Sequence, residues 1–160
     1  MARRIAFSGL VLLVLALVGC DHATKAVAEA ELTQSGPMAL VPGVLELRYV
    51  ENDDTAFSLT RNLSSRIKAP LLAAASTLGL LGVFAMIRRK YPRAGSGERV
   101  ALAFLAAGAI ANVVDRVRRG YVVDFIYLHH WPVFNVADVL IVLGMGWLLV
   151  EAYAARVRAA

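Results

Sequence analysis

Asp124 and Asp138 are two acidic residues with no lysine or arginine three or four positions away in the sequence. Neither carboxylate therefore has an ion-pair partner at helical spacing. Two carboxyl groups held a few ångströms apart cannot both stay ionised, so such a pair shares one proton. The ionised member can activate a water for attack on a peptide carbonyl, while the protonated member donates to the carbonyl oxygen. The chemistry that this pair indicates, if the two side chains converge, is metal-free hydrolysis of a peptide bond.

Further polar residues lie at the ends of long apolar runs, with the spacing of one helix face. The sets are Asp21, Thr24 and Lys25; Asn112, Asp115 and Arg116; and Asn135 with Asp138. Ionisable groups in or beside membrane spans are costly and usually face a bundle interior or a wet cavity, where they carry function. The alternative is a set of ion pairs that only stabilise the protein, namely Asp21 with Lys25, and Asp115 with Arg116 or Arg118. The sequence leaves both roles open.

The elements that must position these residues are membrane-spanning helices. Hydrophobic residues make up 59% of the 160-residue chain, and its mean hydropathy of +0.62 is too high for an ordinary soluble protein. A span needs about 20 apolar residues. Four runs approach that length, at about 5–28, 69–87, 100–114 and 134–150. We therefore expect a single integral membrane domain over residues 1–160, a mainly α bundle of four transmembrane helices.

Basic residues mark one side of this bundle. They are Arg3 and Arg4 before the first run, five Lys or Arg within 88–99, and Arg156 and Arg158 after the fourth run. By the positive-inside rule, both termini and the loop 88–99 are expected in the cytoplasm. This topology makes 29–68 external and places the polar sets near the outer face of the membrane.

The external segment 29–68 is expected to contain a small sheet. The stretch "GVLELRYVEN" follows a Pro42-Gly43 turn and alternates apolar with polar residues, which is typical of a strand. Between the third and fourth spans, Asp124 is expected in a loop. Gly79 and Gly82 of the second span are expected to serve helix packing.

Other functional classes find little support. His22, His129 and His130 do not form a spaced cluster with acids or cysteines, so neither a metal nor another cofactor is expected. The arginines flank apolar runs instead of forming a patch with aromatic residues, which argues against nucleic acid as a partner. Nucleotide-binding loops and serine-nucleophile motifs are absent from the sequence.

Cys20 raises a different possibility, because Leu17-Val18-Gly19-Cys20 resembles the lipobox of a bacterial lipoprotein precursor. A lipoprotein is normally a water-soluble domain on a lipid tether. Here, cutting before Cys20 would remove one span of the bundle. We therefore interpret Cys20 as a small apolar helix residue.

Four short blocks carry a resemblance to a known family. They read "DHATK", "ENDDTAFS", "AAGAIANVVDRVRRGYVVDF" and "FNVADVLIVLG". In this order, and with four spans, they resemble the bacterial lipoprotein signal peptidases, also called signal peptidase II. The resemblance runs from Asp21 to Gly144, and its most specific part is the series N-x-x-D-R, G-x-V-x-D-F and F-N-x-A-D.

The resemblance implies an aspartic endopeptidase of the bacterial inner membrane, surrounded by membrane lipids and needing no metal or other cofactor. Its substrates would be diacylglyceryl-modified prolipoproteins, cut immediately before the lipid-bearing cysteine. Asp124 and Asp138 would be the catalytic aspartates. The supporting residues carry over to Asp21, Lys25, Asn52, Asn112, Asp115, Arg116 and Asn135. Among these, Asn112 and Arg116 would contact or position the substrate.

The chain departs from the family pattern at Asp54 and Thr55, where N-x-G-A-A-F would place glycine and alanine. A glycine often marks a backbone angle or a close approach that a side chain would block. Both residues are therefore possible modulators of substrate preference or inhibitor fit. The departure also leaves an alternative, a divergent or non-catalytic paralogue that acts as a membrane binding or transport protein. Against transport, the polar residues lie at one interface, whereas transporter sites lie near the midplane.

Overall fold

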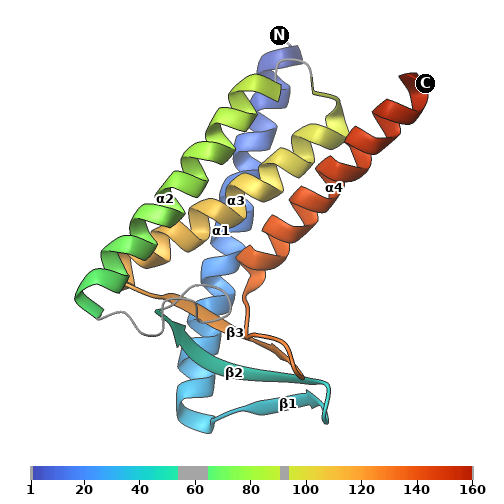
Figure 1. Ribbon diagram of the computed structural model, residues 1–160. Coiled ribbons are helices and arrows are strands. Elements are labelled where there is room, and N and C mark those ends of the chain that lie inside the picture. Colours follow the sequence, from blue (N-terminus) through green and yellow to red (C-terminus); the bar gives the residue numbers. More distant parts are fainter. Residues whose placement is uncertain (1, 54–64, 91–93, 160) are drawn as a thin grey trace.

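The computed structural model describes residues 2–53, 65–90 and 94–159, which form four long helices and a small sheet (Figure 1). The helices are α1 (Ala2–Ser35), α2 (Ser65–Lys90), α3 (Ser96–Arg119) and α4 (Val136–Ala159), and the strands are β1 (Met38–Val41), β2 (Leu45–Asn52) and β3 (Val122–Leu128). Within these residues, all four helices are long and apolar enough to cross a membrane. The predicted fold class, a mainly helical membrane protein with four spans and a small β-containing segment, is confirmed.

Helix α3 is the centre of the bundle and packs against each of the other three helices. It approaches α4 closely because a glycine faces the partner backbone on each side of the contact. A Cβ on Gly108 would overlap the carbonyl oxygen of Ala137, and one on Gly144 would lie 2.7 Å from the carbonyl oxygen of Ala101. This close approach holds the start of α4 against the middle of α3, as small residues allow in membranes.

The packing role expected for Gly79 and Gly82 of α2 is wrong. A Cβ on either residue would have no heavy atom within 4 Å. Both glycines lie on a helix face that borders open space, and a sequence pattern of small residues does not tell which face meets a neighbour.

The three strands form an antiparallel sheet in the order β1-β2-β3. The turn between β1 and β2 contains Gly43, whose φ of 72° suits glycine, and β2 is the strand expected after that turn. The expectation that Asp124 lies in a loop is wrong, because it lies on β3, where its Cα pairs with that of Val50. The run "VVDFIYL" is apolar on both faces apart from Asp124, so it lacks the alternation that marked β2.

Helix α1 connects the bundle to the sheet (Figure 1). It continues to Ser35, beyond the apolar run, and its last turns pack Ala28 and Leu32 against Phe125 of β3 in a small buried core. Because strand side chains alternate between faces, Phe125 facing this core directs the neighbouring Asp124 to the opposite side of β3. The fold thereby turns Asp124 away from the apolar core.

Candidate active site

The carboxylate of Asp124 is buried at the junction of the sheet and the bundle. Its residue is 2% exposed. The side-chain amide of Asn52 on β2 donates to Asp124 Oδ2 at 2.7 Å, and that of Asn135 donates to Oδ1 at 2.6 Å. Burial raises the pKa of Asp124 to about 6, and the nearby charge of Asp138 adds to the effect, while the two amide donors oppose it. Asp124 is therefore poised to exchange a proton near neutral pH.

Asp138 is held by the N-terminus of its own helix. The backbone N–H of Asp138 donates to Asn135 Oδ1 at 3.0 Å, and the backbone N–H of Asn135 donates back to Asp138 Oδ2 at 3.2 Å. This reciprocal arrangement is a capping box at the start of α4. The amide of Asn112 on α3 completes the set by donating to Asp138 Oδ1 at 2.8 Å.

Asn135 and Asn112 connect the two carboxylates. The same amide nitrogen of Asn135 that bonds Asp124 also lies 3.3 Å from Asn112 Oδ1. Each of the four carboxyl oxygens of Asp124 and Asp138 therefore accepts one N–H. Side chains bonded in this way have fixed positions, which is what acid–base chemistry requires.

A buried ion-pair network lies behind this pair and joins three helices. Lys25 Nζ lies 2.8 Å from Asp21 Oδ2 and 2.8 Å from Asp115 Oδ2, and it donates to Asn112 Oδ1 at 3.2 Å. These three partners match the three donors of an ammonium group. Asp21 Oδ1 in turn accepts the backbone N–H of Ala137 at 2.8 Å. The network ties α1 and α3 to the first turn of α4, where Asp138 lies.

The ion pairs expected from sequence spacing are correct for Asp21 with Lys25 and wrong for Asp115. Asp115 pairs with Lys25 at 2.8 Å and lies 3.7 Å from both Arg119 and His22, instead of pairing with Arg116 or Arg118. Arg119 lies one helical turn after Asp115, whereas Lys25 reaches it from another helix, a contact that local spacing does not reveal.

Arg116 contributes positive charge at the edge of the site. Its side chain is half-buried, its Nη1 donates to the Asn112 carbonyl oxygen at 3.4 Å, and its charge acts on both Asp124 and Asp138. A guanidinium in this position can attract a carbonyl or phosphate oxygen of a bound molecule.

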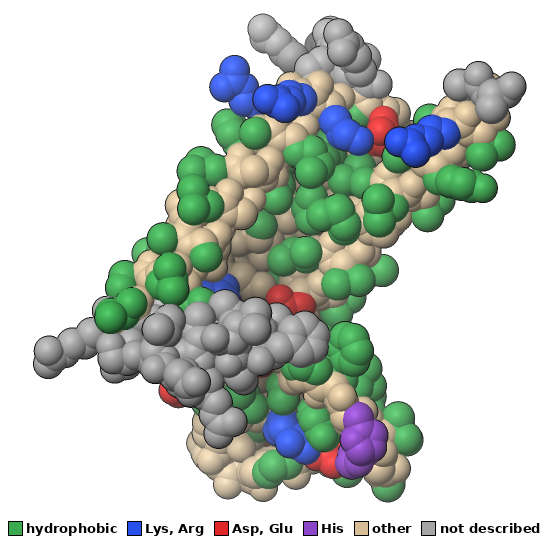
Figure 2. Space-filling view, viewed as in Figure 1, with side chains coloured by type: hydrophobic (Ala, Val, Ile, Leu, Met, Phe, Trp, Pro, Cys, Tyr) green, Lys and Arg blue, Asp and Glu red, His purple; other side chains and the backbone are tan. Residues whose placement is uncertain are grey.

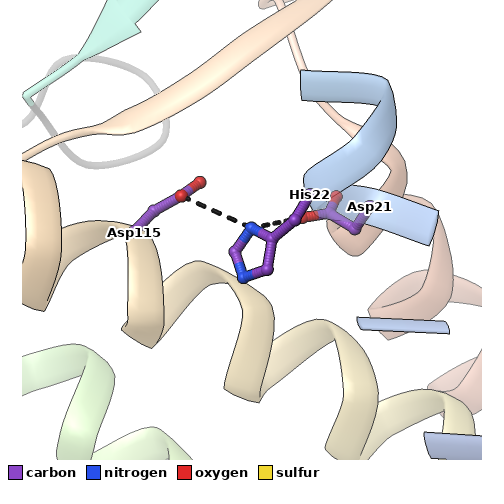
Figure 3. A group of neighbouring side chains, drawn as sticks. All are labelled: Asp21, His22 and Asp115. Carbon is purple, nitrogen blue, oxygen red and sulfur yellow. Dashed lines mark ion pairs between the residues drawn. The ribbon is translucent and has the colours of Figure 1, made fainter. Parts of the chain in front are cut away.

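His22 joins Asp21 and Asp115 in a group that the sequence did not reveal, because Asp115 lies on a different helix (Figure 3). His22 Nδ1 lies 3.7 Å from Asp115 Oδ1 and 4.0 Å from Asp21 Oδ2, and atoms of all three side chains fall within 4.8 Å of one another. The ammonium of Lys25 already supplies positive charge between the same carboxylates. A divalent ion beside that ammonium would meet electrostatic repulsion, so this donor set does not fit a metal well.

The structure brings together most of the residues expected in the site. They are Asp21, Lys25, Asn52, Asn112, Asp115, Arg116, Asp124, Asn135 and Asp138. Thr24 instead bonds carbonyl oxygens of its own helix. Asp54 and Thr55 lie outside the described residues. Sequence reasoning missed the hydrogen bond from the backbone N–H of Ala137 to Asp21. It also missed the capping box, although Asn135-x-x-Asp138 before an apolar run is a recognisable signal for one.

Comparison with known proteins gives the family. Residues 13–154 match the family described as signal peptidase (SPase) II, a stretch that includes every residue of the site. The chain belongs to the signal peptidase II family. It is 33% identical to a lipoprotein signal peptidase of Syntrophotalea carbinolica over 95% of both chains. It is also 37% identical to one of Dehalococcoides mccartyi over 88% of both chains.

Two solved structures of bacterial membrane enzymes share the fold of this signal peptidase II family member. One has a TM-score of 0.75 at 24% identity and covers 91% of this chain and 92% of its own. The other has a TM-score of 0.73 at 23% identity and covers 92% of this chain and 88% of its own. The four helices with a small sheet at one end are therefore an arrangement already seen in membrane enzymes.

Proposed function

We propose that this protein removes the signal peptide from diacylglyceryl-modified prolipoproteins as an aspartic endopeptidase, cutting before the lipid-modified cysteine. The observation that carries the proposal is the pair Asp124 and Asp138, whose four carboxyl oxygens each accept an N–H. Family membership supports the substrate class, since the relatives are named lipoprotein signal peptidases. No metal or other cofactor takes part in the proposed reaction.

In the proposed reaction, the two aspartates share one proton. The ionised carboxylate takes a proton from water as the water oxygen attacks the scissile carbonyl carbon, and the protonated carboxyl donates its proton to the carbonyl oxygen. When the tetrahedral intermediate collapses, the carboxyl that took the proton from water gives it to the amide nitrogen and the C–N bond breaks. A hydroxyl of the intermediate returns its proton to the other carboxylate, so the pair again shares one proton. The raised pKa of Asp124, about 6, allows it to hold or release the shared proton near neutral pH.

The surrounding residues have supporting roles in this proposal. Asn52 and Asn135 orient Asp124, and Asn112 orients Asp138. Arg116, together with Asn112, would position the substrate beside the dyad formed by Asp124 and Asp138. The network of Asp21, Lys25 and Asp115 would keep the helices from shifting.

We also propose that the protein lies in the bacterial inner membrane with both termini in the cytoplasm, the loop 88–99 cytoplasmic, the segment 29–68 external and the dyad near the outer face. Figure 2 supports this orientation, because lysine and arginine side chains gather at the end of the bundle away from the sheet. These include Arg88, Arg89 and Lys90 in the last turn of α2, and Arg156 and Arg158 in that of α4.

The test is cleavage of a diacylglyceryl-modified prolipoprotein by the purified protein in detergent, followed by gel shift. Asp124→Asn and Asp138→Asn should each lose at least about 100-fold in rate, the lower limit for removing a general acid or base. Glu51→Gln, an exposed acid on β2, is the matched control and should cleave like the wild type. Cleavage at the wild-type rate by either aspartate variant would rule out Asp124 and Asp138 as the catalytic pair.

A further inference from the structure

An apolar groove lies between α1, α2 and α3 (Figure 1) and extends from the end of the bundle away from the sheet toward the level of the dyad. Its volume is about 540 Å³, within the range of pockets that hold small molecules. Lining residues include Val14 of α1, Phe84 of α2 and Ala106 of α3. On α1 the lining ends at Leu15, six residues or about 9 Å before Asp21, and on α3 it ends at Ile110, two residues before Asn112. Within the described chain, the residues that line the groove therefore include none of those that bond Asp124 or Asp138.

Among the described residues that line the groove, the charged ones are two arginines. Arg88 lies in the last turn of α2, and Arg99 lies near the start of α3. Both therefore come from the same end of the bundle, beside the loop that joins α2 to α3. A site with apolar walls and two guanidinium groups at one end suits an amphiphile that has an apolar chain and an anionic head.

We propose that the groove binds an acyl chain of an anionic phospholipid, with the lipid phosphate held by Arg88 and Arg99. The lipid would come from the membrane leaflet at the end of the bundle where these two arginines lie. Basic pockets between transmembrane helices are known to bind anionic lipid headgroups. The lipid would fill space between α1 and α2, which pack mainly on α3. In the apolar span of α2, 6% of the residues are buried within the protein, the smallest share among the four spans. A bound lipid would therefore add more packing contacts to α2 than to a helix that is already covered.

Charge argues for a lipid over the signal helix of a substrate. The region before the apolar stretch of a signal peptide is positively charged. In the proposed topology that region would lie at the same end as Arg88 and Arg99, and like charges would repel. A second copy of this chain would bring its own basic residues to the same level, with the same repulsion.

The first experiment is native mass spectrometry of the full chain in detergent, titrated with dioleoyl phosphatidylglycerol or dioleoyl phosphatidylcholine. We expect one phosphatidylglycerol to be retained more tightly than phosphatidylcholine. The double variant Arg88→Gln/Arg99→Gln should weaken phosphatidylglycerol binding about thirtyfold, from about fivefold per basic residue near the membrane surface. The control Arg89→Gln/Lys90→Gln removes the same charge from residues outside the groove and should bind like the wild type.

A second variant tests whether the chain occupies the groove. Ala106→Phe fills it and should abolish retention of phosphatidylglycerol. If that variant does not elute as a folded monodisperse protein, Val11→Trp on the exposed rim replaces it. Equal retention of the two lipids, equal loss in both double variants, or full retention with a filled groove would overturn the proposal. The readout needs no cleavage, so it stands or fails separately from the proposed peptidase activity.

Discussion

Asn52 is the donor whose removal tests the electrostatics of Asp124 most directly. Its hydrogen bond lowers the pKa of Asp124 against the larger raising effect of burial. In Asn52→Ala, we expect the pKa of Asp124 to rise above its value of about 6. The rise should be about one pH unit, because the carboxylate loses a hydrogen bond that stabilises its charged form. Because the protonated form then persists to higher pH, the limb of the kcat/KM profile that reports Asp124 should move upward.

The measurement is the pH profile of prolipoprotein cleavage for Asn52→Ala beside Glu51→Gln. Glu51 is the neighbouring exposed residue on β2, so its variant should leave the limb in place. A limb that stays unmoved in Asn52→Ala would mean that the titration of Asp124 does not control the rate.

Lys25 is the residue on which the buried network depends. Replacing it in Lys25→Met leaves Asp21 and Asp115 buried without their shared cation. Breaking a buried ion pair in this way costs about 3–5 kcal/mol. We therefore expect the Lys25→Met protein to unfold at a lower temperature than the wild type. The measurement is thermal unfolding in detergent, monitored by tryptophan fluorescence. Lys90→Met, at the exposed end of α2, is the control.

A second substitution separates charge from packing at the same place. Adding Asp115→Asn to Lys25→Met removes one of the two orphaned carboxylates, so part of the lost stability should return. If Lys25→Met unfolds at the same temperature as Lys90→Met, the network contributes little to stability and does not hold the three helices together.

At the scale of elements, the contact between α3 and α4 fixes Asp138. Gly108→Ala would place a methyl group against the Ala137 carbonyl oxygen and Ile141, and Ala137 directly precedes Asp138. Overpacking of this kind costs about 1–3 kcal/mol. A displacement of about 1 Å at a reacting group lowers rates about 100-fold, so we expect cleavage to fall by about that factor.

The control for this substitution is Gly82→Ala on α2, where the added Cβ meets nothing within 4 Å. Because the added Cβ meets nothing, this variant should keep its activity, and because alanine is the better helix former, it should unfold at or above the wild-type temperature. Cleavage assays and thermal unfolding of the two variants, side by side, check the prediction. Equal activity would show that the helices can separate without moving Asp138.

The spacing rule explains which elements were predictable. Residues three or four apart on one helix, such as Asp21 with Lys25, share a face, so periodicity alone brings them together. Strand β3 was not predicted because its apolar residues occupy both faces. The hydrogen bond from the Ala137 backbone N–H to Asp21 was not predicted because every residue type except proline has this group. The pairing of Lys25 with Asp115 also escaped, since only the packing of α1 on α3 creates it.

At the scale of the whole molecule, α1 sets the geometry between membrane and site. It passes from the bundle through Asp21 and Lys25 to the core under β3, formed with Ala28 and Leu32. Four spans could be predicted because composition and run length suffice for that conclusion. The placement of the sheet could not, because it depends on how far α1 continues beyond its apolar run.

The orientation of the molecule yields the last prediction, which cysteine labelling in intact cells can test. Cys20 is exposed and is the single cysteine of the chain, so Cys20→Ser provides a silent background. In that background, Glu51→Cys on the sheet should react with a membrane-impermeant maleimide that has entered the periplasm. Arg156→Cys, at the basic end of α4, should react only after the inner membrane is permeabilised. The expectation follows from the positive-inside rule, because the Lys and Arg clusters of α2 and α4 lie at the end opposite the sheet. The reverse labelling pattern would place the dyad at the cytoplasmic face, where a peptidase would meet prolipoproteins before their cleavage sites had crossed the membrane.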